Sequence, residues 1–422
     1  MDFRALITGL SLALLHHSAL AGHPTFSLYT FDSPPYQYAT GSPSGPQVSG
    51  ETVDTVRCAM ARAGAAVNIK LIPQNRARYS LERNLIDGYF AVDRSMDPET
   101  DAIVSHPVAL EKWHWFYTDT RPDPRLAKIG VVSGSNEAMW LAEQGLKPFV
   151  TVASAEQLPA LLKRNRIDLA LMDQRVMNLL EQATPALGQL LHHSFVRYAP
   201  LHLYLSRRFS NEHTEFLPLF NRHLPDCMTA HLKLSEDERQ QVASVAEALI
   251  QDLSGKVSFS RTIHQGPSYD THTDILTQDT VWRALAPRQA TPLAAQILAL
   301  PVSEALAQWQ SEKSPLVTEV LVINTKGALV AMSQLSSDYW QGDEPKFQEI
   351  VIETEESLVQ RASLWISPIR YDASTSQFQI TVSVPIPLAE PNNGLEGVLS
   401  LGLAIEAVLQ SPEERDQHSA TH

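Results

Sequence analysis

The sequence has few cysteines and no strongly basic segment. Only two of its 422 residues are cysteines, and 47 acidic residues outnumber 33 lysines and arginines, for a net charge of -14. No run of Arg and Lys forms a basic patch, so we expect no nucleic-acid partner. Hydrophobic residues make up 44% of the chain, which is enough for full cores, and the length fits two to three domains.

Motifs of common enzyme families are also missing. There is no Gly-x-Ser-x-Gly and no His-Glu-x-x-His, and Ser254-Gly255-Lys256 lacks the glycine that a Walker loop needs. The 15 histidines are scattered without metal-ligand spacing, and His192 and His193 would point to opposite faces of a strand. We therefore predict a protein that is not an enzyme and that uses no metal or cofactor.

Long apolar runs are absent after the first 21 residues. Ala5 to Leu15 is apolar but too short to span a bilayer, and Ala19-Leu20-Ala21 follows it as a cleavage signal. This pattern predicts a cleaved signal peptide over residues 1–21; a buried N-terminal helix is the alternative. No later segment has the roughly 18 uninterrupted apolar residues of a membrane helix. We expect an exported protein in the periplasm that is not embedded in the membrane.

The two cysteines, Cys58 and Cys227, are candidates for a disulfide. An isolated pair in an oxidising compartment favours a bridge, and two buried thiols are the alternative. The bridge would join a helix predicted over residues 51–63 to the end of the first module.

Residues 26–92 follow the order strand, helix, strand, helix, strand. Period-two alternation from residue 26 predicts the first strand, and Val53, Val56 and Met60 recur at helical spacing. This order indicates an α/β lobe with a largely parallel sheet, whose ligands bind beyond the carboxyl ends of the strands. The residues predicted at those ends are Asp32, Tyr36, Arg76 and Asp93.

Three short motifs carry a family resemblance. Phe31-Asp32-Ser33-Pro34-Pro35-Tyr36, Asn84-Leu85-Ile86-Asp87-Gly88 and Ser105-His106-Pro107, in this order, resemble bacterial extracellular solute-binding proteins of the amino-acid-binding type. The resemblance covers about residues 26–228 and implies the two-lobed α/β fold of type 2 periplasmic binding proteins.

The resemblance also implies how this module is divided. Lobe 1 would comprise about residues 24–118 and 206–232, and lobe 2 about 122–205. The lobes would close on a ligand through hinges at residues 118–124 and 200–208.

The second lobe contributes further candidate binding residues. Ser135 and Asn136 open a helix, where backbone N–H groups can bind an anion, although a helix cap without a ligand explains them equally well. The run from Asp168 to Asp173 is similar to a family pattern whose last Asp receives the ligand's ammonium group. Asp173 is therefore the expected cation site, and Tyr36 would offer an apolar face; an N-cap is the other role for Asp173.

One departure from the family pattern affects the ligand. The family places an Arg, which binds the α-carboxylate, in a segment where this chain has Thr100. Free amino acids are therefore doubtful ligands unless Arg76 or Arg94 substitutes, and Arg76 could equally be a solvated surface residue.

The last third of the chain predicts a separate α+β module. Residues 233–273 are expected to be a linker, within which Ser235 to Leu253 is charged and helix-prone, and a helical region follows over 274–309. Five β-prone stretches then cover 317–324, 328–333, 363–371, 377–385 and 395–405.

This module resembles the extracytoplasmic, PAS-like Cache domains. The resemblance rests on residues 322–327, 337–344 and 397–401 and covers about 274–410, with a disordered tail over 411–422. It implies a second ligand site at Tyr339, Trp340 and Asp343; as the alternative, Tyr339 and Trp340 fill the core.

We therefore expect a periplasmic solute-binding or sensing protein for a small polar ligand, amino-acid-like or an amine. Its partner would be a membrane permease or a sensor receptor, and the Cache-like module favours sensing. The alternatives are the solute-binding subunit of an ABC transporter, an interaction protein with a degenerate cleft, and a hydrolase without a recognisable motif.

Overall fold

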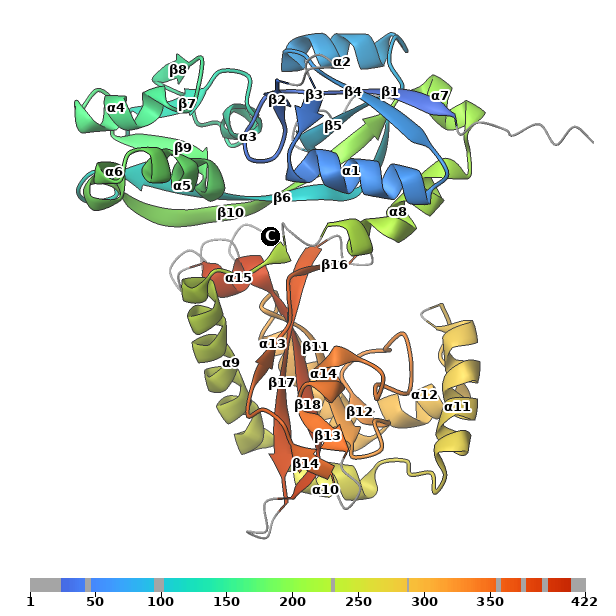
Figure 1. Ribbon diagram of the computed structural model, residues 1–422. Coiled ribbons are helices and arrows are strands. Elements are labelled where there is room, and N and C mark those ends of the chain that lie inside the picture. Colours follow the sequence, from blue (N-terminus) through green and yellow to red (C-terminus); the bar gives the residue numbers. More distant parts are fainter. Residues whose placement is uncertain are drawn as a thin grey trace, which may run out of the picture.

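The computed structural model describes residues 24–41, 47–94, 102–228, 232–286, 288–353, 358–372, 377–388 and 394–410. The predicted signal peptide, Thr100 and the predicted tail lie outside these residues. Two modules lie one above the other, and the upper module in Figure 1 is formed by the first half of the chain.

One eight-stranded sheet runs through the first module, in the order β4-β1-β5-β10-β6-β9-β7-β8. The three strands β1, β4 and β5 are parallel, as are β7, β8 and β9, and the antiparallel pair of β6 and β10 joins the two groups. The strands are β1 (Thr25–Thr30), β4 (Ala66–Leu71), β5 (Gly88–Asp93), β6 (Ile103–Tyr117), β7 (Ile129–Val132), β8 (Val150–Val152), β9 (Leu169–Asp173) and β10 (His192–Leu205). A separate hairpin comprises β2 (Tyr38–Thr40) and β3 (Gln47–Ser49).

The strands β6 and β10 cross between two lobes. Leu201 to Leu205 of β10 pair with β5 in the first lobe, whereas Trp113 to Phe116 of β6 pair with β9 in the second lobe. The crossing therefore lies near residues 110–112 and 198–200. The strands thus cross between the lobes before the predicted hinge at 118–124 and at the start of the predicted hinge at 200–208, because β6 continues without a break into the second lobe before the Pro-rich turn. The predicted lobe limits of 118, 122 and 205–206 lie some residues beyond this crossing.

Helices cover this sheet on both sides (Figure 1). α1 (Glu51–Arg62) buries Val53, Val56 and Met60, which are the positions whose spacing predicted a helix. The disulfide between Cys58 and Cys227 is present, with a Cα–Cα distance of 5.8 Å, and joins α1 to α8 (Phe216–Cys227) as predicted. The other helices are α2 (Gln74–Glu82), α3 (Asn136–Glu143), α4 (Gln157–Lys163), α5 (Gln174–Ala183), α6 (Ala186–Leu190) and α7 (Arg207–Glu212).

The second module contains an antiparallel sheet in the order β12-β11-β18-β17-β15, with β16 beside β17. The five predicted β-prone stretches all contain strands, and the third contains both β15 and β16. The strands are β11 (Val317–Asn324), β12 (Leu329–Met332), β13 (Val351–Glu353), β14 (Leu358–Gln360), β15 (Trp365–Ile366), β16 (Arg370–Asp372), β17 (Gln377–Pro387) and β18 (Leu395–Ala404). The helices are α9 (Glu236–Lys256), α10 (Phe259–Gln265), α11 (His272–Leu285), α12 (Pro292–Leu298), α13 (Pro301–Glu312), α14 (Pro345–Gln348) and α15 (Ile405–Leu409).

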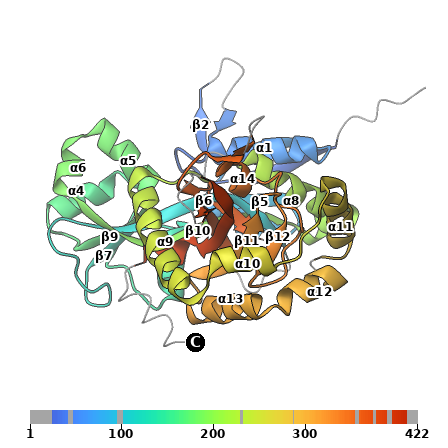
Figure 2. The same cartoon turned by 90° about the horizontal axis from the view of Figure 1, so that it is seen from below.

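Both faces of the second sheet are packed. Val320 and Val322 of β11 belong to a core with α9 and α13, whereas Leu321 and Ile323 belong to a core with α11 and α12. Figure 2 shows these helices arranged around the sheet.

The predicted linker over residues 233–273 was wrong. Most of its first half forms α9, which buries four apolar side chains at helical spacing against the second sheet. Polar residues surround these positions in the sequence, so composition obscured the apolar stripe. The buried positions are Val242, Ala246, Leu249 and Leu253.

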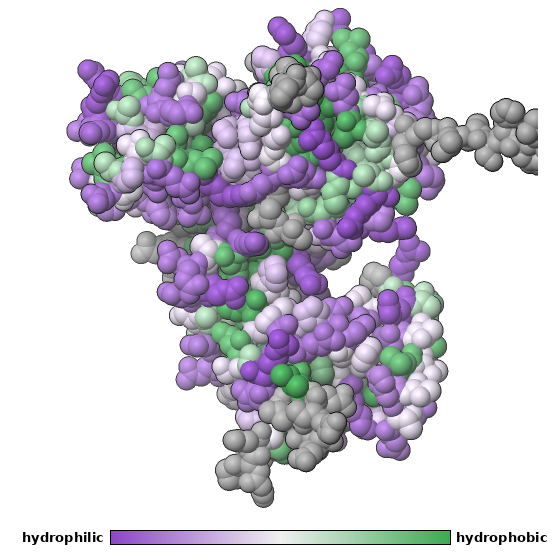
Figure 3. All heavy atoms as spheres, in the orientation of Figure 1, coloured by the Kyte–Doolittle hydropathy of each residue, from purple (hydrophilic) through white to green (hydrophobic). Residues whose placement is uncertain are grey.

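Among the described residues, no helix has both the length and the apolar character needed to cross a membrane. Charged and polar residues cover much of the face seen in Figure 3, and apolar residues lie between them in small groups.

Candidate functional site

A cavity of about 450 Å³ lies between the two lobes of the first module. Its walls come from the segments that follow β1, β4, β7 and β8, and from the end of β9. This is the edge at which ligands of parallel sheets bind. The first lobe contributes Phe31, Asp32, Ser33, Pro34, Pro73 and Gln74, the crossing strand contributes Glu111, and the second lobe contributes Val132 to Glu137, Ala153 to Glu156, Met172, Asp173 and Val176.

The cavity lining is strongly acidic. It includes five carboxylic side chains, whereas no Lys or Arg occurs among the described residues that line it. A cavity walled by one sign of charge attracts ligands of the opposite sign. The acidic residues are Asp32, Glu111, Glu137, Glu156 and Asp173.

Asp173 is held by four hydrogen bonds from within the protein. Its Oδ1 accepts from the backbone N–H groups of Arg175 at 2.9 Å and Val176 at 3.1 Å, so it caps α5. Its Oδ2 accepts from the Lys112 N–H at 2.8 Å and from the Tyr36 hydroxyl at 3.0 Å. Burial raises the pKa of Asp173, and these hydrogen bonds act in the opposite direction. The carboxylate lines the cavity and is also the N-cap considered from the sequence.

Tyr36 connects the lobes and does not line the cavity. Its side chain is fully buried, and the turn after β1 directs its hydroxyl to Asp173 in the other lobe. The predicted apolar face for the ligand was therefore misplaced, because the Tyr36 N–H bonds to the Ser33 carbonyl oxygen in a tight turn. Phe31 and Pro34, before and within this turn, line the cavity instead.

Two further contacts hold the lobes together. Arg175 forms an ion pair with Glu51 of the first lobe, and its guanidinium lies 5.0 Å from the centre of the Tyr36 ring. The Asn136 side chain donates to the Ala91 carbonyl oxygen at 3.0 Å and accepts from the Asp93 N–H at 3.3 Å. Because the two lobes contact each other directly on several sides of the cavity, the structure shows them in a closed arrangement.

The start of α3 is a helix cap in an acidic setting. The Ser135 hydroxyl accepts from the Ala138 N–H at 3.2 Å, which is the predicted N-cap. Asn136 is occupied by the first lobe, and Glu137 lies in the first turn and lines the cavity. The Glu137 carboxylate would repel an anion here, so the anion site predicted at Ser135 and Asn136 is disfavoured.

Three of the cavity carboxyl groups, Glu111, Glu137 and Glu156, were not predicted as site residues from the sequence. Glu111 is 3% exposed and accepts a 2.8 Å hydrogen bond from the Trp113 indole. Burial, with Glu137 and Asp173 nearby, raises the pKa of Glu111 well above its ordinary value. Burial also raises the pKa of Glu137 to about 7. The cluster therefore favours bound protons until a cation compensates its charge.

The two arginines predicted to replace the family Arg do not line the cavity. Arg76 and Arg94 are both exposed, and neither is among the described lining residues. Arg94 lies close enough to His106 and His202 that, after burial itself, it lowers the pKa of both imidazoles. Neither Arg is therefore placed to bind a ligand carboxylate at this cavity.

The predicted second site lies partly in a core. Tyr339 is fully buried and packs against Tyr269 and Trp282, as in the core alternative. The Trp340 indole donates to the Lys326 carbonyl oxygen at 3.0 Å, and Asp343 is exposed. Within the part of the chain that the structure describes, no group of three or more His, Cys, Asp or Glu side chains is placed to hold a metal ion.

No protein-family model and no curated protein matches the sequence. Several solved structures are similar to about half of the chain. A histidine kinase sensor domain with similarity to periplasmic binding proteins has 18% identity, covers 48% of this chain and 90% of its own, and has a TM-score of 0.40.

Two further binding-protein structures are similar to about the same extent. A Salmonella typhimurium periplasmic binding protein with high arginine specificity has 15% identity, covers 48% of this chain and 96% of its own, and has a TM-score of 0.39. An ABC uptake transporter substrate binding protein from Streptococcus pneumoniae with bound histidine has 13% identity, covers 49% of this chain and 89% of its own, and has a TM-score of 0.40. The two-lobed description of the first module rests on its own sheet order and crossing strands.

Proposed function

We propose that this is an exported solute-binding and sensing protein whose first module closes on a small cationic ligand that carries an amine. The observation that carries this proposal is the acidic cavity between the lobes, where five carboxylic residues converge and the described lining contains no Lys or Arg. A protonated amine would stabilise the ionised forms of Glu111 and Glu137 and would form charge-assisted hydrogen bonds with them.

The same lining disfavours a free α-amino acid. Its α-carboxylate would have to enter an acidic cavity without the Arg that the family uses, and Thr100 occupies that position in the sequence. A diamine, a guanidine-bearing amine or a similar cation avoids this repulsion. We therefore place amines without a carboxylate ahead of amino acids.

Binding would act through the two crossing strands. A ligand that contacts both lobes binds the closed arrangement more tightly than an open one and shifts the population toward it. The antiparallel second module, with its packed helices, supports the Cache-like reading and favours sensing through a membrane receptor over delivery to a permease.

One observation favours a second candidate, an interaction protein with a degenerate cleft. Asp173 already has four hydrogen bonds within the protein, one of them from Tyr36 of the other lobe. On this alternative the module is permanently closed and serves as a rigid docking body.

A calorimetric titration of residues 22–422 separates the two candidates. The ligands would be putrescine, agmatine, L-lysine, L-arginine, succinate and glucose. The variants are Glu111→Gln and Glu137→Gln, with Asp343→Asn as the matched control, because Asp343 is an exposed acid in the other module.

We expect amines to bind to the wild type and to the control, and the two cavity variants to bind at least about tenfold more weakly. Loss of binding in the Asp343→Asn variant alone would move the ligand site to the second module. If no compound binds at all, the degenerate cleft is the better description.

A further inference from the structure

The second module contacts the first at the strands on which the lobes would turn. Leu110 of β6 and Tyr198 of β10 belong to one apolar cluster with Val242 of α9 and Leu401 of β18. Both residues lie at the crossing, where Lys112 pairs with Tyr198 and Leu110 pairs with Pro200. The core of the second module is therefore continuous with the crossing strands.

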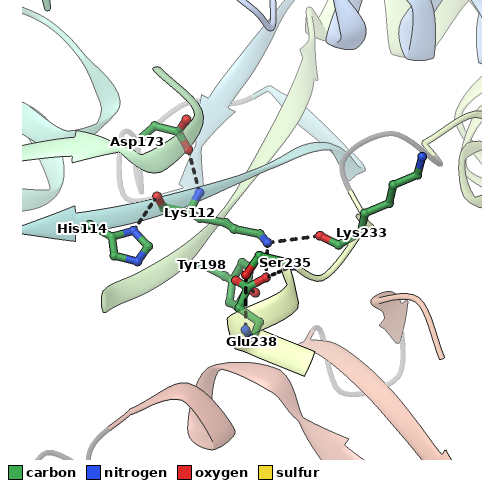
Figure 4. Close-up of polar contacts among 7 residues, drawn as sticks. All are labelled: Lys112, His114, Asp173, Tyr198, Lys233, Ser235 and Glu238. Carbon is green, nitrogen blue, oxygen red and sulfur yellow. Dashed lines mark hydrogen bonds and ion pairs between the residues drawn. The ribbon is translucent and has the colours of Figure 1, made fainter. Parts of the chain in front are cut away.

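Strand geometry directs neighbouring side chains of β6 to opposite sides. Successive side chains of a strand alternate between the two faces of its sheet. Glu111 lines the cavity, and the next residue, Lys112, extends its side chain toward α9 (Figure 4). One strand segment thus carries a cavity residue and a module-contacting residue side by side.

Lys112 is tied to both sites at once. Its backbone N–H donates to Asp173 of the cavity at 2.8 Å, while its Nζ donates to Oε2 of Glu238 at 2.6 Å and to the Lys233 carbonyl oxygen at 3.2 Å. The Lys112 and Glu238 side chains are only 7% and 10% exposed. An ion pair this buried is costly to break, since either charge alone would remain desolvated.

The second crossing strand reaches the same carboxylate. The Tyr198 hydroxyl donates to Oε1 of Glu238 at 2.8 Å, so β6 and β10 each hold one oxygen. Glu238 is also fixed within its own module, where it forms a capping box with Ser235 at the start of α9. Any change in the relative position of the two strands at the crossing must strain or release these bonds.

We infer that the second module is an intramolecular reader of lobe closure, and that the contact of Lys112 and Tyr198 with Glu238 transmits the state of the cleft to α9. Coupling of this kind rests on the proposed closure of the lobes. By reciprocity, the same contact lets the second module bias how readily the lobes close.

The test opens the lobes by mutation and uses no ligand. Its outcome therefore does not depend on whether the cavity binds an amine. Arg175→Ala removes the interlobe ion pair with Glu51. Hydrogen exchange is then measured in the full chain at the amides of residues 236–240, which begin α9. The comparison is made with Lys112 intact and in the Lys112→Met background, which keeps the aliphatic stem but removes the ammonium.

We expect Arg175→Ala to accelerate exchange at the start of α9 about fivefold or more with Lys112 intact, and to have no effect there in the Lys112→Met background. Tyr198→Phe removes one hydroxyl, and in this background the logarithm of the increase in exchange rate caused by Arg175→Ala should be half as large. Lys256→Met is the matched control, because its exposed ion pair with Glu312 lies at the other end of α9, and it should leave the transmission intact.

The result that would overturn the inference is an unchanged exchange rate at α9 after Arg175→Ala, or the same acceleration in both Lys112 backgrounds. Exchange at the Asp93 amide, which bonds to Asn136 of the other lobe, reports whether the lobes opened in each variant. If Lys112→Met does not fold, the Tyr198→Phe background decides between the same two outcomes.

Discussion

The Tyr36 hydroxyl in the first lobe donates a 3.0 Å hydrogen bond to Oδ2 of Asp173 in the second lobe, and both side chains are buried. Tyr36→Phe would leave this oxygen with only the Lys112 N–H as donor. We expect the free energy of unfolding to fall by about 1–2 kcal/mol, as measured by urea denaturation. The control is Tyr79→Phe, since Tyr79 is 49% exposed, and equal losses in the two variants would refute the role of the interlobe bond.

The stability of the protein should depend on pH through Glu137. Burial raises its pKa from 4.5 to about 7, so folding favours the protonated form. The resulting stability is fully present below pH 4.5 and is lost as pH rises through about 7. Over this range the wild type should lose up to about 3 kcal/mol relative to the Glu137→Gln variant. Thermal unfolding at several pH values checks this, and parallel profiles would contradict it.

The affinity for an amine should depend on pH in the opposite direction. A bound cation favours the ionised form of Glu137 and releases its proton, so binding weakens as pH falls below about 7. We expect the dissociation constant of agmatine to increase by up to about tenfold per pH unit below this value. Calorimetry in buffers with different ionisation enthalpies would detect the released proton. A flat profile in the wild type would be evidence against Glu137 as a ligand contact.

Removing only one partner of the ion pair between Lys112 and Glu238 should destabilise the protein more than removing both partners. Burial raises the pKa of Glu238, but the Lys112 ammonium and hydrogen bonds from Ser235 and Tyr198 more than offset this and lower it. Lys112→Met should therefore cost about 3–5 kcal/mol, and adding Glu238→Gln should restore part of this loss. The contribution of the pair is present above pH 4.5 and is lost as pH falls through the lowered pKa. Additive losses in the double variant would contradict the pairing.

Local patterns in the sequence were sufficient for many elements of the fold. The alternation from Phe26 and the helical spacing from Val53 reflect burial on one face, which local periodicity records directly. The five β-prone stretches of the second module were found for the same reason. The packing of residues 233–273 was not predicted, although residues 235–253 are helix-prone, because α9 packs only a narrow apolar stripe against a sheet that comes later in the chain.

The candidate site was harder to predict because it depends on contacts between distant residues. Asp173 could be identified from a local motif, whereas the bond from Tyr36 spans 137 positions. Glu111 lies inside a strand and looks like an interruption of an apolar run until β6 is known to cross between the lobes. Its neighbour Lys112 has no local feature that indicates a partner at residue 238.

The disulfide between Cys58 and Cys227 should contribute substantially to stability, since it closes a loop with a sequence separation of 169 residues. It joins α1 to α8, and constraint of the unfolded chain is its main effect in the loop-entropy model. We expect the Cys58→Ala, Cys227→Ala double variant to lose about 2–5 kcal/mol. A reductant should lower the unfolding midpoint of the wild type toward that of the double variant and leave the double variant unchanged. If the reductant shifts both proteins equally, it acts elsewhere, and the bridge is not what stabilises the first module.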